Sequence, residues 1–444
     1  METQPIIAHK RFSFAWILDA LLGKITRDPL EQRNFFWHSI AYVGLFGANS
    51  LCLTELLNTY LAKCGFTNQQ LGTIAMYPFL ANSLGMFLWT GLVDKIQRRL
   101  RAIAISGIMM TVQPLGIIAL LLLYPTQQPH PAILYGVIAL NVIFNLIQSM
   151  SWMLDMSIFV RCIREQTRGR AWGIMGVIAG LMNVIVVTQI ARWAHAQYAP
   201  NIALILCMTV GVGLWVARAI AYLKHQELPD LSVPGASQSV NPFAALKVVF
   251  RIKECRALVY PQILRGATSA MAAFIIPFVV KHMPTPDTFG SYLAMMAQAG
   301  LILGSLLVAL LRDRMGSGLV VFIGDTMVGL GFGLLFVTHN WMFALPVYAL
   351  VAIGNNVEGS AVPLGTFSII PAQIMGAFSG IRAAVTAVAA ALASRYGGQL
   401  LDVVNPLTVF GFVAGLKVVN GIWFWFVFEH YKPVVLPAEK PAAT

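Results

Sequence analysis

The side chains that could carry chemistry in this chain are ionisable groups placed inside long apolar runs. We single out carboxylates and guanidinium groups at Glu55, Asp155, Arg218, Arg265, Asp325, Glu358 and Arg382. Burying a charge among apolar residues is costly, so such groups usually carry protons, bind charged solutes or pair with one another. They are therefore the first functional candidates in this sequence.

Amide and acid side chains also form one stripe within the apolar run of residues 132–160. Asn141, Asn145, Gln148 and Asp155 recur at i, i+4, i+7 and i+14, a spacing that places them on one face of a helix. We interpret this stripe as the lining of a solute cavity. The alternative is that its amides hold neighbouring helices together through hydrogen bonds.

Position along the runs leaves alternatives open for several candidates. Asp155 lies near the end of its run, where pairing with Arg161 or Arg218 competes with proton carriage. Glu55 lies in the last third of the first run and is either a proton site or a contact of an outer gate. Asp325 and Arg218 lie near predicted helix ends, where side chains that reach toward water explain them better.

The sequence lacks the motifs of enzymes and of nucleotide-driven pumps. None of its eight histidines falls in an HExxH pattern, and it has neither a Walker A glycine loop nor a GxSxG turn. We expect His38 to be a packed or interfacial histidine. The five cysteines are scattered without a CxxC pair, which argues against a zinc site or a disulfide framework. We therefore expect no enzymatic activity, no metal and no cofactor, with an ion gradient, most simply of protons, as the energy source.

Composition identifies the solvent of this chain as a lipid bilayer. Of its 444 residues, 58% are hydrophobic and 11% are charged, which is less than half the charged share of ordinary soluble domains. The net charge of +12 is gathered in short clusters between apolar runs. Anionic lipid headgroups account for such clusters, so we expect the bilayer and a small solute as partners and no nucleic acid.

The apolar runs predict an all-α integral membrane protein with twelve spans. The predicted spans are residues 34–60, 71–89, 102–124, 132–160, 171–190, 202–223, 257–280, 292–311, 319–338, 341–367, 374–397 and 406–429. Lys and Arg cluster after the second, fourth and eighth spans and in the stretch 224–256. The positive-inside rule then places both termini in the cytoplasm, and eleven or thirteen spans would not satisfy it.

The basic stretch 224–256 divides the chain into two similar parts. We predict an N-terminal cytoplasmic segment (1–33), a six-helix half (34–223), a cytoplasmic linker (224–256), a second six-helix half (257–430) and a cytoplasmic tail (431–444). Asp94 and Lys95 follow the second span, and Asp313 and Arg314 follow the eighth, 219 residues later. Such an echo is typical of transporters built from two repeats.

The loop after the second span resembles the signature of the major facilitator superfamily of secondary transporters. That signature reads Gly-x-Leu-[Ala/Ser]-Asp-[Arg/Lys]-x-Gly-[Arg/Lys]-[Arg/Lys]. The chain matches it at Leu92, Asp94, Lys95, Arg98 and Arg99. It departs at both glycines, where Thr90 and Gln97 stand. Further likeness lies in residues 65–72, in Arg161, and in residues 165–170 that lead into the fifth span.

The resemblance implies a gate and a central cavity. In the family the carboxylate of the loop bonds an arginine of helix 4 and faces the N-terminus of helix 11, so Asp94 takes that role here with Arg161 as its partner. The basic residues Lys95, Arg98 and Arg99 then belong to the gate or only fix topology, and Asp313 and Arg314 are their counterparts in the second half. The family cavity is lined by helices 1, 4, 7 and 10. The gate residues are Asp94, Lys95, Arg98, Arg99, Arg161, Asp313 and Arg314, and the cavity candidates are Glu55, Asn145, Gln148, Asp155, Arg265, Glu358 and Arg382.

Depth along the helices suggests one specific ion pair. Arg265 lies about nine residues, or roughly 14 Å, from the inner end of its span, and Glu358 lies at roughly 15 Å. We predict that the two pair when the site is empty. Arg382 lies at comparable depth and is the main competitor for Glu358.

Together these features predict a monomeric secondary transporter of the bacterial inner membrane or plasma membrane. It would move a small organic solute by alternating access, coupled to protons, and the buried Arg265 favours an anionic solute. One alternative is an exporter of hydrophobic or amphipathic compounds, drug-like or siderophore-like. The other is a receptor of the same fold that binds a ligand without transporting it.

Overall fold

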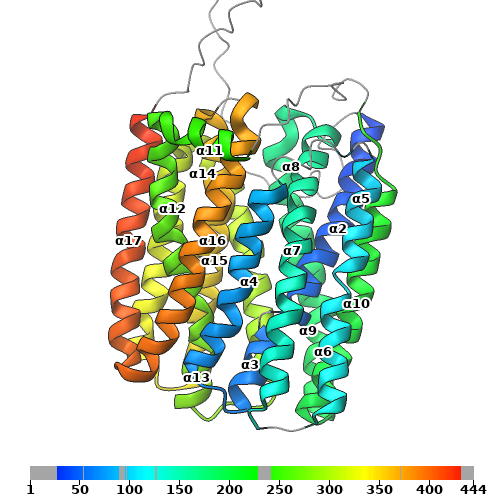
Figure 1. Cartoon of the computed structure of the whole chain (residues 1–444), viewed down its shortest axis with the longest axis vertical. Helices are drawn as coiled ribbons and strands as arrows, with labels where there is room; N and C mark the ends of the chain where they lie inside the picture. Colours follow the sequence, from blue (N-terminus) through cyan, green and yellow to red (C-terminus); the bar gives the residue numbers. More distant parts are fainter. Residues whose placement is uncertain are drawn as a thin grey trace, which may run out of the picture.

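The computed structural model describes residues 28–53, 55–89, 96, 98–125, 128–228, 242–370 and 372–431. For residues 160, 165–170, 242–245, 248, 313, 367 and 372–377 it describes the backbone alone. The described residues are almost entirely helical (Figure 1).

The first part of the chain runs from α2 to α10. Its elements are α2 (Pro29–Cys52), α3 (Glu55–Lys63), α4 (Asn68–Trp89), α5 (Arg99–Met109), α6 (Val112–Leu123), α7 (Pro131–Cys162), α8 (Glu165–Met182), the π-helical η2 (Asn183–Val187), α9 (Thr188–Gln197) and α10 (Pro200–Leu223). We call it the N-terminal part.

The second part begins after a short helix of the linker, α11 (Pro242–Arg251). Its elements are α12 (Lys253–Met271), η3 (Ala272–Phe274), α13 (Ile275–His282), α14 (Phe289–Leu334), η4 (Leu335–Val337), α15 (Trp341–Ile369), α16 (Ala372–Val403) and α17 (Pro406–His430). We call it the C-terminal part. The sequence pattern did not predict α11.

The predicted membrane character is confirmed. Ten helical stretches of the described residues are long and apolar enough to cross a bilayer. The first is longer than expected, because α2 and α3 together extend over Pro29–Lys63. Two more helices, α15 and α16, are 29 and 32 residues long. The count of twelve spans and the cytoplasmic position of the termini stay predictions.

Helix starts follow caps that are visible in the sequence. The Asp28 side chain accepts from Leu30 N at 2.9 Å, with Pro29 at the first helical position. Asn405 does the same for α17, where Pro406 follows the cap. Such side chains satisfy backbone N–H groups that have no partner within the helix, and proline lacks the N–H there.

A glycine turns the chain inside the segment named α14. Gly316 has φ 75° and ψ 160°, so α14 divides there into two helices instead of forming one rod. The two stretches of α14 that are long and apolar enough to cross a bilayer are Phe289–Arg312 and Arg314–Val337. Glycine adopts this backbone conformation without the steric cost that a side chain would add. The sequence predicted a break between residues 311 and 319, and Gly316 lies within it.

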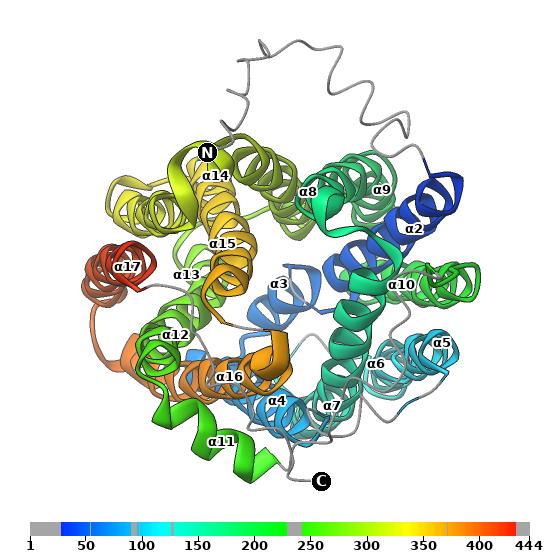
Figure 2. The same cartoon turned by 90° about the horizontal axis from the view of Figure 1, so that it is seen from above.

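The helices stand side by side, with the N-terminal part on one side and the C-terminal part on the other (Figure 2). The parts meet where α4 packs on α16 and where α8 packs on α14. Small residues permit this approach: a Cβ on Gly72 would collide with the carbonyl oxygen of Ser394, and one on Gly176 with the Ser305 hydroxyl.

The two ends of the bundle differ in charge. The end that holds α11, the C-terminus of α7 and the N-terminus of α12 lies at the top of Figure 1. Its described cations include Arg99, Arg161 and Lys253, at the ends of α5, α7 and α12. We call it the basic end. The opposite end holds the C-termini of α3 and α13, and we call it the far end. By the positive-inside rule the basic end is predicted to face the cytoplasm.

Candidate functional site

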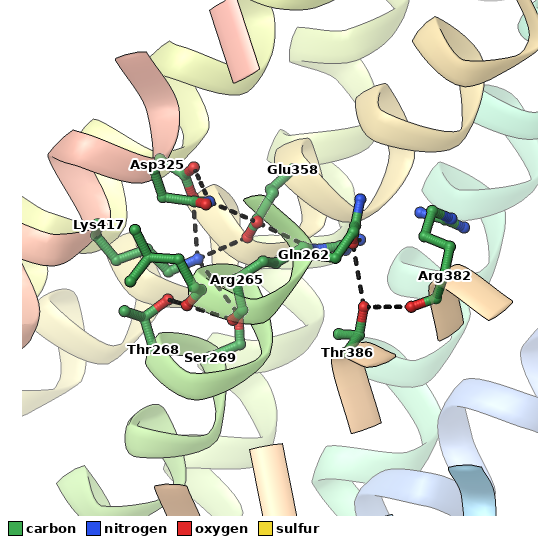
Figure 3. A network of polar contacts seen from close by, with 11 residues as sticks. Gln262, Arg265, Thr268, Ser269, Asp325, Glu358, Arg382, Thr386 and Lys417 are labelled. Atoms are coloured by element: carbon green, nitrogen blue, oxygen red, sulfur yellow. Dashed lines mark hydrogen bonds and ion pairs between the residues drawn. The ribbon is translucent and has the colours of Figure 1, made fainter. Parts of the chain in front are cut away.

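A network of charged groups lies between helices of the C-terminal part (Figure 3). Its centre is the ammonium group of Lys417 on α17. Lys417 Nζ donates to Glu358 Oε2 at 2.7 Å and to Asp325 Oδ1 at 2.9 Å. It also lies 3.3 Å from the Ser269 hydroxyl. Three helices besides α17 therefore supply acceptors to one cation.

The predicted pair of Arg265 and Glu358 is in contact. Arg265 Nε lies 3.0 Å from Glu358 Oε1. The depth argument thus identified two residues that meet, and their role in transport stays a prediction. What the sequence analysis missed is that Glu358 has a second cationic partner in Lys417, on its other oxygen.

The network balances its charges. Two carboxylates, Asp325 and Glu358, face two cations, Arg265 and Lys417. The Lys417 and Asp325 side chains are fully buried. Asn420 Nδ2 donates to Asp325 Oδ2 at 2.8 Å, which occupies the second oxygen of that carboxylate. A buried pair is tolerated when its oxygens and protons find hydrogen-bond partners, and this arrangement meets that requirement.

The expectation that Asp325 lies near a helix end was wrong. Its helix continues after the turn at Gly316, so Asp325 is nine residues beyond the turn, or about 13 Å at 1.5 Å per residue. Lys417 and Asn420 carried a sequence signal that could have found them. They are polar residues three apart in the otherwise apolar stretch 406–428 and so share a helix face.

Arg382 on α16 lies beside this network. The expectation that it competes for Glu358 was wrong. Lys417 takes that place. Among the contacts that the structure describes, Arg382 Nε has no hydrogen-bond partner. The residue is connected to Arg265 indirectly: Thr386 Oγ1 donates to the Arg382 carbonyl at 2.9 Å and lies 3.1 Å from Gln262 Oε1. Arg265 Nη1 donates to the same Gln262 oxygen at 3.4 Å.

A second buried group surrounds Asp155 in the N-terminal part. His38 Nε2 lies 3.3 Å from Asp155 Oδ1, with both side chains fully buried, and the Tyr222 hydroxyl donates to the same oxygen. His38 is packed, which is one of the two alternatives that we predicted: it is buried against the rings of Tyr42 and Phe159, and it also contacts a carboxylate. Arg218 does not pair with Asp155; its guanidinium lies 5.4 Å from the centre of the Tyr222 ring.

Hydrogen bonds fix the tautomers around Asp155. Burial lowers the pKa of His225, which follows the span of α10, to about 3, so its ring is neutral at physiological pH. His225 Nδ1 faces the Ala221 carbonyl at 3.0 Å and must donate to it. His225 Nε2 then accepts from His38 Nδ1 at 3.1 Å. This leaves His38 Nε2 facing Asp155 Oδ1 at 3.3 Å.

The amide stripe of α7 is split between two environments. Gln113 Nε2 lies 3.1 Å from Asn141 Oδ1, so Asn141 links α7 to α6. Asn145 donates to the Asn141 carbonyl of its own helix at 2.8 Å. Asn145 and Gln148 are half-buried. The first member of the stripe thus joins helices, while a cavity role for Asn145 and Gln148 stays a prediction.

The predicted gate at the basic end falls partly outside the described residues. Asp94, Lys95 and the Asp313 side chain lie outside them, so the expected contact of Asp94 with Arg161 is also outside. Arg161 Nη1 lies 3.5 Å from Glu227 Oε2. Arg99 donates to the Ser157 hydroxyl at 2.9 Å and thereby joins α5 to α7. Arg98 and Arg314 are exposed.

Side chains at the far end connect the two parts of the chain. The Tyr348 hydroxyl of α15 donates to Glu55 Oε1 of α3 at 3.0 Å. The two alternatives for Glu55, a proton site or a contact of an outer gate, both stay predictions. Lys63 Nζ lies 2.8 Å from Asp287 Oδ1. Arg395 donates to the Thr73 hydroxyl at 2.6 Å. These bonds hold the two parts of the chain together at the far end in this conformation.

Asp402 adds a contact that sequence analysis did not find. It lies at the far end of α16 and accepts from the first backbone N–H groups of α4. Gln69 N donates to Asp402 Oδ2 at 2.9 Å, and Asn68 N lies 3.3 Å from Oδ1. An anion at a helix N-terminus meets the positive end of the helix dipole and satisfies unpaired donors. No local pattern marks such a bond, because its partners are 333 and 334 residues apart.

Taken together, the fold and the buried charges define an integral, multi-pass membrane protein with polar contacts between two helical parts. Comparison with solved structures identifies the architecture as the major facilitator fold. The nucleoside transporter NupG matches with a TM-score of 0.63 and 16% identity, over 91% of this chain and 100% of that one. FucP, a major facilitator transporter in the outward conformation, matches at 0.61 and 14%, over 88% and 98%.

The xylose transporter XylE from E. coli, in a partially occluded inward-open conformation, matches with a TM-score of 0.62 and 12% identity, over 88% of this chain and 98% of that one. No protein-family model and no curated protein sequence matches the chain. The likeness is therefore one of fold, and it covers nearly the whole chain.

Proposed function

We propose that this protein is a secondary active transporter that moves a small anionic organic solute across the inner or plasma membrane by alternating access. The similar structures are described as transporters of nucleosides and xylose and as a major facilitator transporter, which supports the transporter class. The solute class, the coupling to protons and the membrane are inferred from the charged groups of this chain.

The observation that carries the anionic solute is Arg382. The four-charge network of Asp325, Glu358, Arg265 and Lys417 is neutral as a whole, so the Arg382 guanidinium adds one positive charge beside it. Within the described residues Arg382 forms no ion pair. A planar guanidinium matches carboxylate and phosphate geometry, so a solute with such a group would complete the charge balance.

The partners of Glu358 support the proposal of proton coupling. Its carboxylate holds Arg265 on one oxygen and Lys417 on the other. When a proton neutralises Glu358, Arg265 loses its counter-charge, and an unpaired buried charge is costly. An anionic solute bound at Arg265 and Arg382 removes that cost. Proton and anion therefore favour each other's binding, which gives symport. One proton and one monovalent anion carried together move no net charge.

Alternating access uses the contacts at the far end. While the far end is closed, solute enters from the basic end. The positive-inside rule predicts that this end is cytoplasmic. Exchange to the opposite state breaks the bonds of Asp402, Lys63 and Glu55 across the two parts. Each is a polar contact of modest energy, so binding of proton and solute can shift the equilibrium.

The test is solute binding followed by flux. Purified protein is screened against carboxylates and phosphate esters for thermal stabilisation, since a binder raises stability by mass action. Hits are then tested in proteoliposomes for solute uptake and proton movement. We expect Arg382→Gln to abolish both, while Arg101→Gln, which removes an exposed arginine at the basic end, leaves both intact.

Other outcomes decide against the proposal in distinct ways. Stabilisation by a ligand without flux in proteoliposomes would identify a receptor. Hits confined to uncharged hydrophobic compounds would favour the exporter alternative. Flux of an anion that is unchanged in Arg382→Gln would remove this residue from the solute site.

A further inference from the structure

A groove lies at the basic end between the start of α12 and the end of α17. Its volume is about 250 Å³. Its lining combines cations and aromatic rings: Lys253, Arg256, Ala257, Tyr260, Trp423, Phe426, Val427 and Tyr431. None of these residues belongs to the charged network or to the far-end contacts.

The groove opens on the surface that faces lipid. Tyr260 is 46% exposed, Trp423 40% and Phe426 54%, although all three belong to membrane-crossing helices. They lie within about two turns of the helix ends at the basic end. Trp and Tyr at this depth are typical of the boundary between hydrocarbon and headgroups. The lining aromatics therefore stand where phospholipid headgroups and the first acyl carbons lie.

Two cations, Lys253 and Arg256, border the groove. Lys253 and Arg256 are exposed and lie one turn apart on α12. Lys253 Nζ is 5.8 Å from the centre of the Tyr431 ring. Within the described part of the chain neither cation forms an ion pair. The nearby Glu429 points elsewhere, because its Oε1 lies beside Gly316.

The geometry points to a binding site for one anionic phospholipid. The phosphate contacts Lys253 and Arg256, the glycerol region enters the groove, and the acyl chains follow the exposed faces of Tyr260, Trp423 and Phe426. A volume of about 250 Å³ suits a headgroup and not whole chains, which agrees with chains that lie outside on the helix surfaces. Basic pockets between membrane helices at the cytoplasmic interface recognise lipids in this way.

The test compares three probes on the full chain in detergent. These are a two-chain phosphatidylglycerol, the zwitterionic phosphatidylethanolamine with the same chains, and water-soluble glycerol phosphate. Bound lipid is measured by native mass spectrometry, and thermal stability is measured in parallel. Each cation near the surface contributes about fivefold in affinity, so we expect about a 30-fold preference for phosphatidylglycerol. Glycerol phosphate is expected neither to bind nor to compete.

Two double variants are compared, and each removes two cations from the basic end. Lys253→Gln with Arg256→Gln is expected to lose the preference, and Lys247→Gln with Arg251→Gln on α11 is expected to keep it. An equal loss in both double variants would show a diffuse surface charge effect and overturn the site. Binding of glycerol phosphate as tight as that of the lipid would overturn the lipid as occupant. If the double variant does not fold, the single variant Arg256→Gln replaces it, and its preference for phosphatidylglycerol is expected to fall about fivefold. Because the readout is lipid binding, it is independent of the transported solute.

Discussion

Lys417 makes it possible to bury two carboxylates close to each other. An ammonium group has three donors and no preferred plane, so it can bind Asp325, Glu358 and Ser269 at once. Glu358 in turn holds Arg265, whose side chain is 18% exposed while that of Lys417 is fully buried. The two cations therefore differ in access to solvent, and Arg265 is the more accessible of the two.

This difference predicts unequal effects within the Arg265–Glu358 pair. Glu358→Gln removes the only described acid bonded to Arg265, while Arg265→Gln leaves Glu358 paired with Lys417. We expect Glu358→Gln to be the more destabilising, by up to about 3–5 kcal/mol, and Arg265→Gln to be milder. The double variant should cost less than the sum, with a coupling of about 1–3 kcal/mol.

The measurement is a double-mutant cycle on thermal stability and on flux in proteoliposomes. Lys224→Gln, at an exposed cation that begins the linker, is the control and should change neither quantity. Strictly additive effects would mean that the two side chains do not interact in the membrane.

At the scale of elements, one contact controls how α4 and α16 meet at the far end. Asp402→Asn removes the negative charge at the N-terminus of α4 but retains an acceptor. We expect this to weaken the far-end closure by about 1 kcal/mol, a shift of about fivefold toward a far-end-open state. Spin labels at Ala196 and His339, both exposed at the far end in different parts of the chain, should report longer distances.

The labelling experiment has two favourable features. All five native cysteines are buried, so introduced cysteines at the surface should react first. Glu429→Gln removes an exposed carboxylate at the basic end and serves as the control. An unchanged distance distribution in Asp402→Asn would show that the contact only caps the helix.

Local sequence predicted elements better than it predicted partners. Apolar runs, the caps at Asp28 and Asn405, and the turn near Gly316 are short-range signals, and the helices appear where those signals lie. The predicted depth of Asp325 was wrong because its helix continues directly after Gly316, ahead of the predicted start at residue 319. Lys417 was missed because one lysine changes the hydropathy of a long apolar helix very little. Its partners on other helices come from packing, which no local pattern specifies.

At the scale of the whole molecule, the two ends must lie on opposite sides of the membrane. The loop at residues 64–67 belongs to the far end, and residues 224–228 belong to the basic end. Reporter fusions after Tyr60 and after Leu223 should therefore report outside and inside, as the Lys and Arg asymmetry predicts. An accessibility tag inserted in the loop at residues 198–199, which is expected to lie outside, tests a second connection at the far end. The reverse pattern would overturn the predicted orientation.

The last prediction joins the two ends. Asp402 closes the far end on the N-terminus of α4, and the family resemblance gives Asp94 the matching task at the basic end on the N-terminus of α16. If both hold, each substitution to Asn destabilises a different state of one equilibrium. Asp94→Asn alone should then favour far-end closure and impair flux, while Asp402→Asn alone should favour the opposite state. Two such shifts of similar size cancel in the difference between the states, so the double variant should regain a near wild-type distance distribution at the far end. Label distances and flux at equal membrane abundance measure all three variants. Wild-type flux in Asp94→Asn would show that its loop serves topology alone.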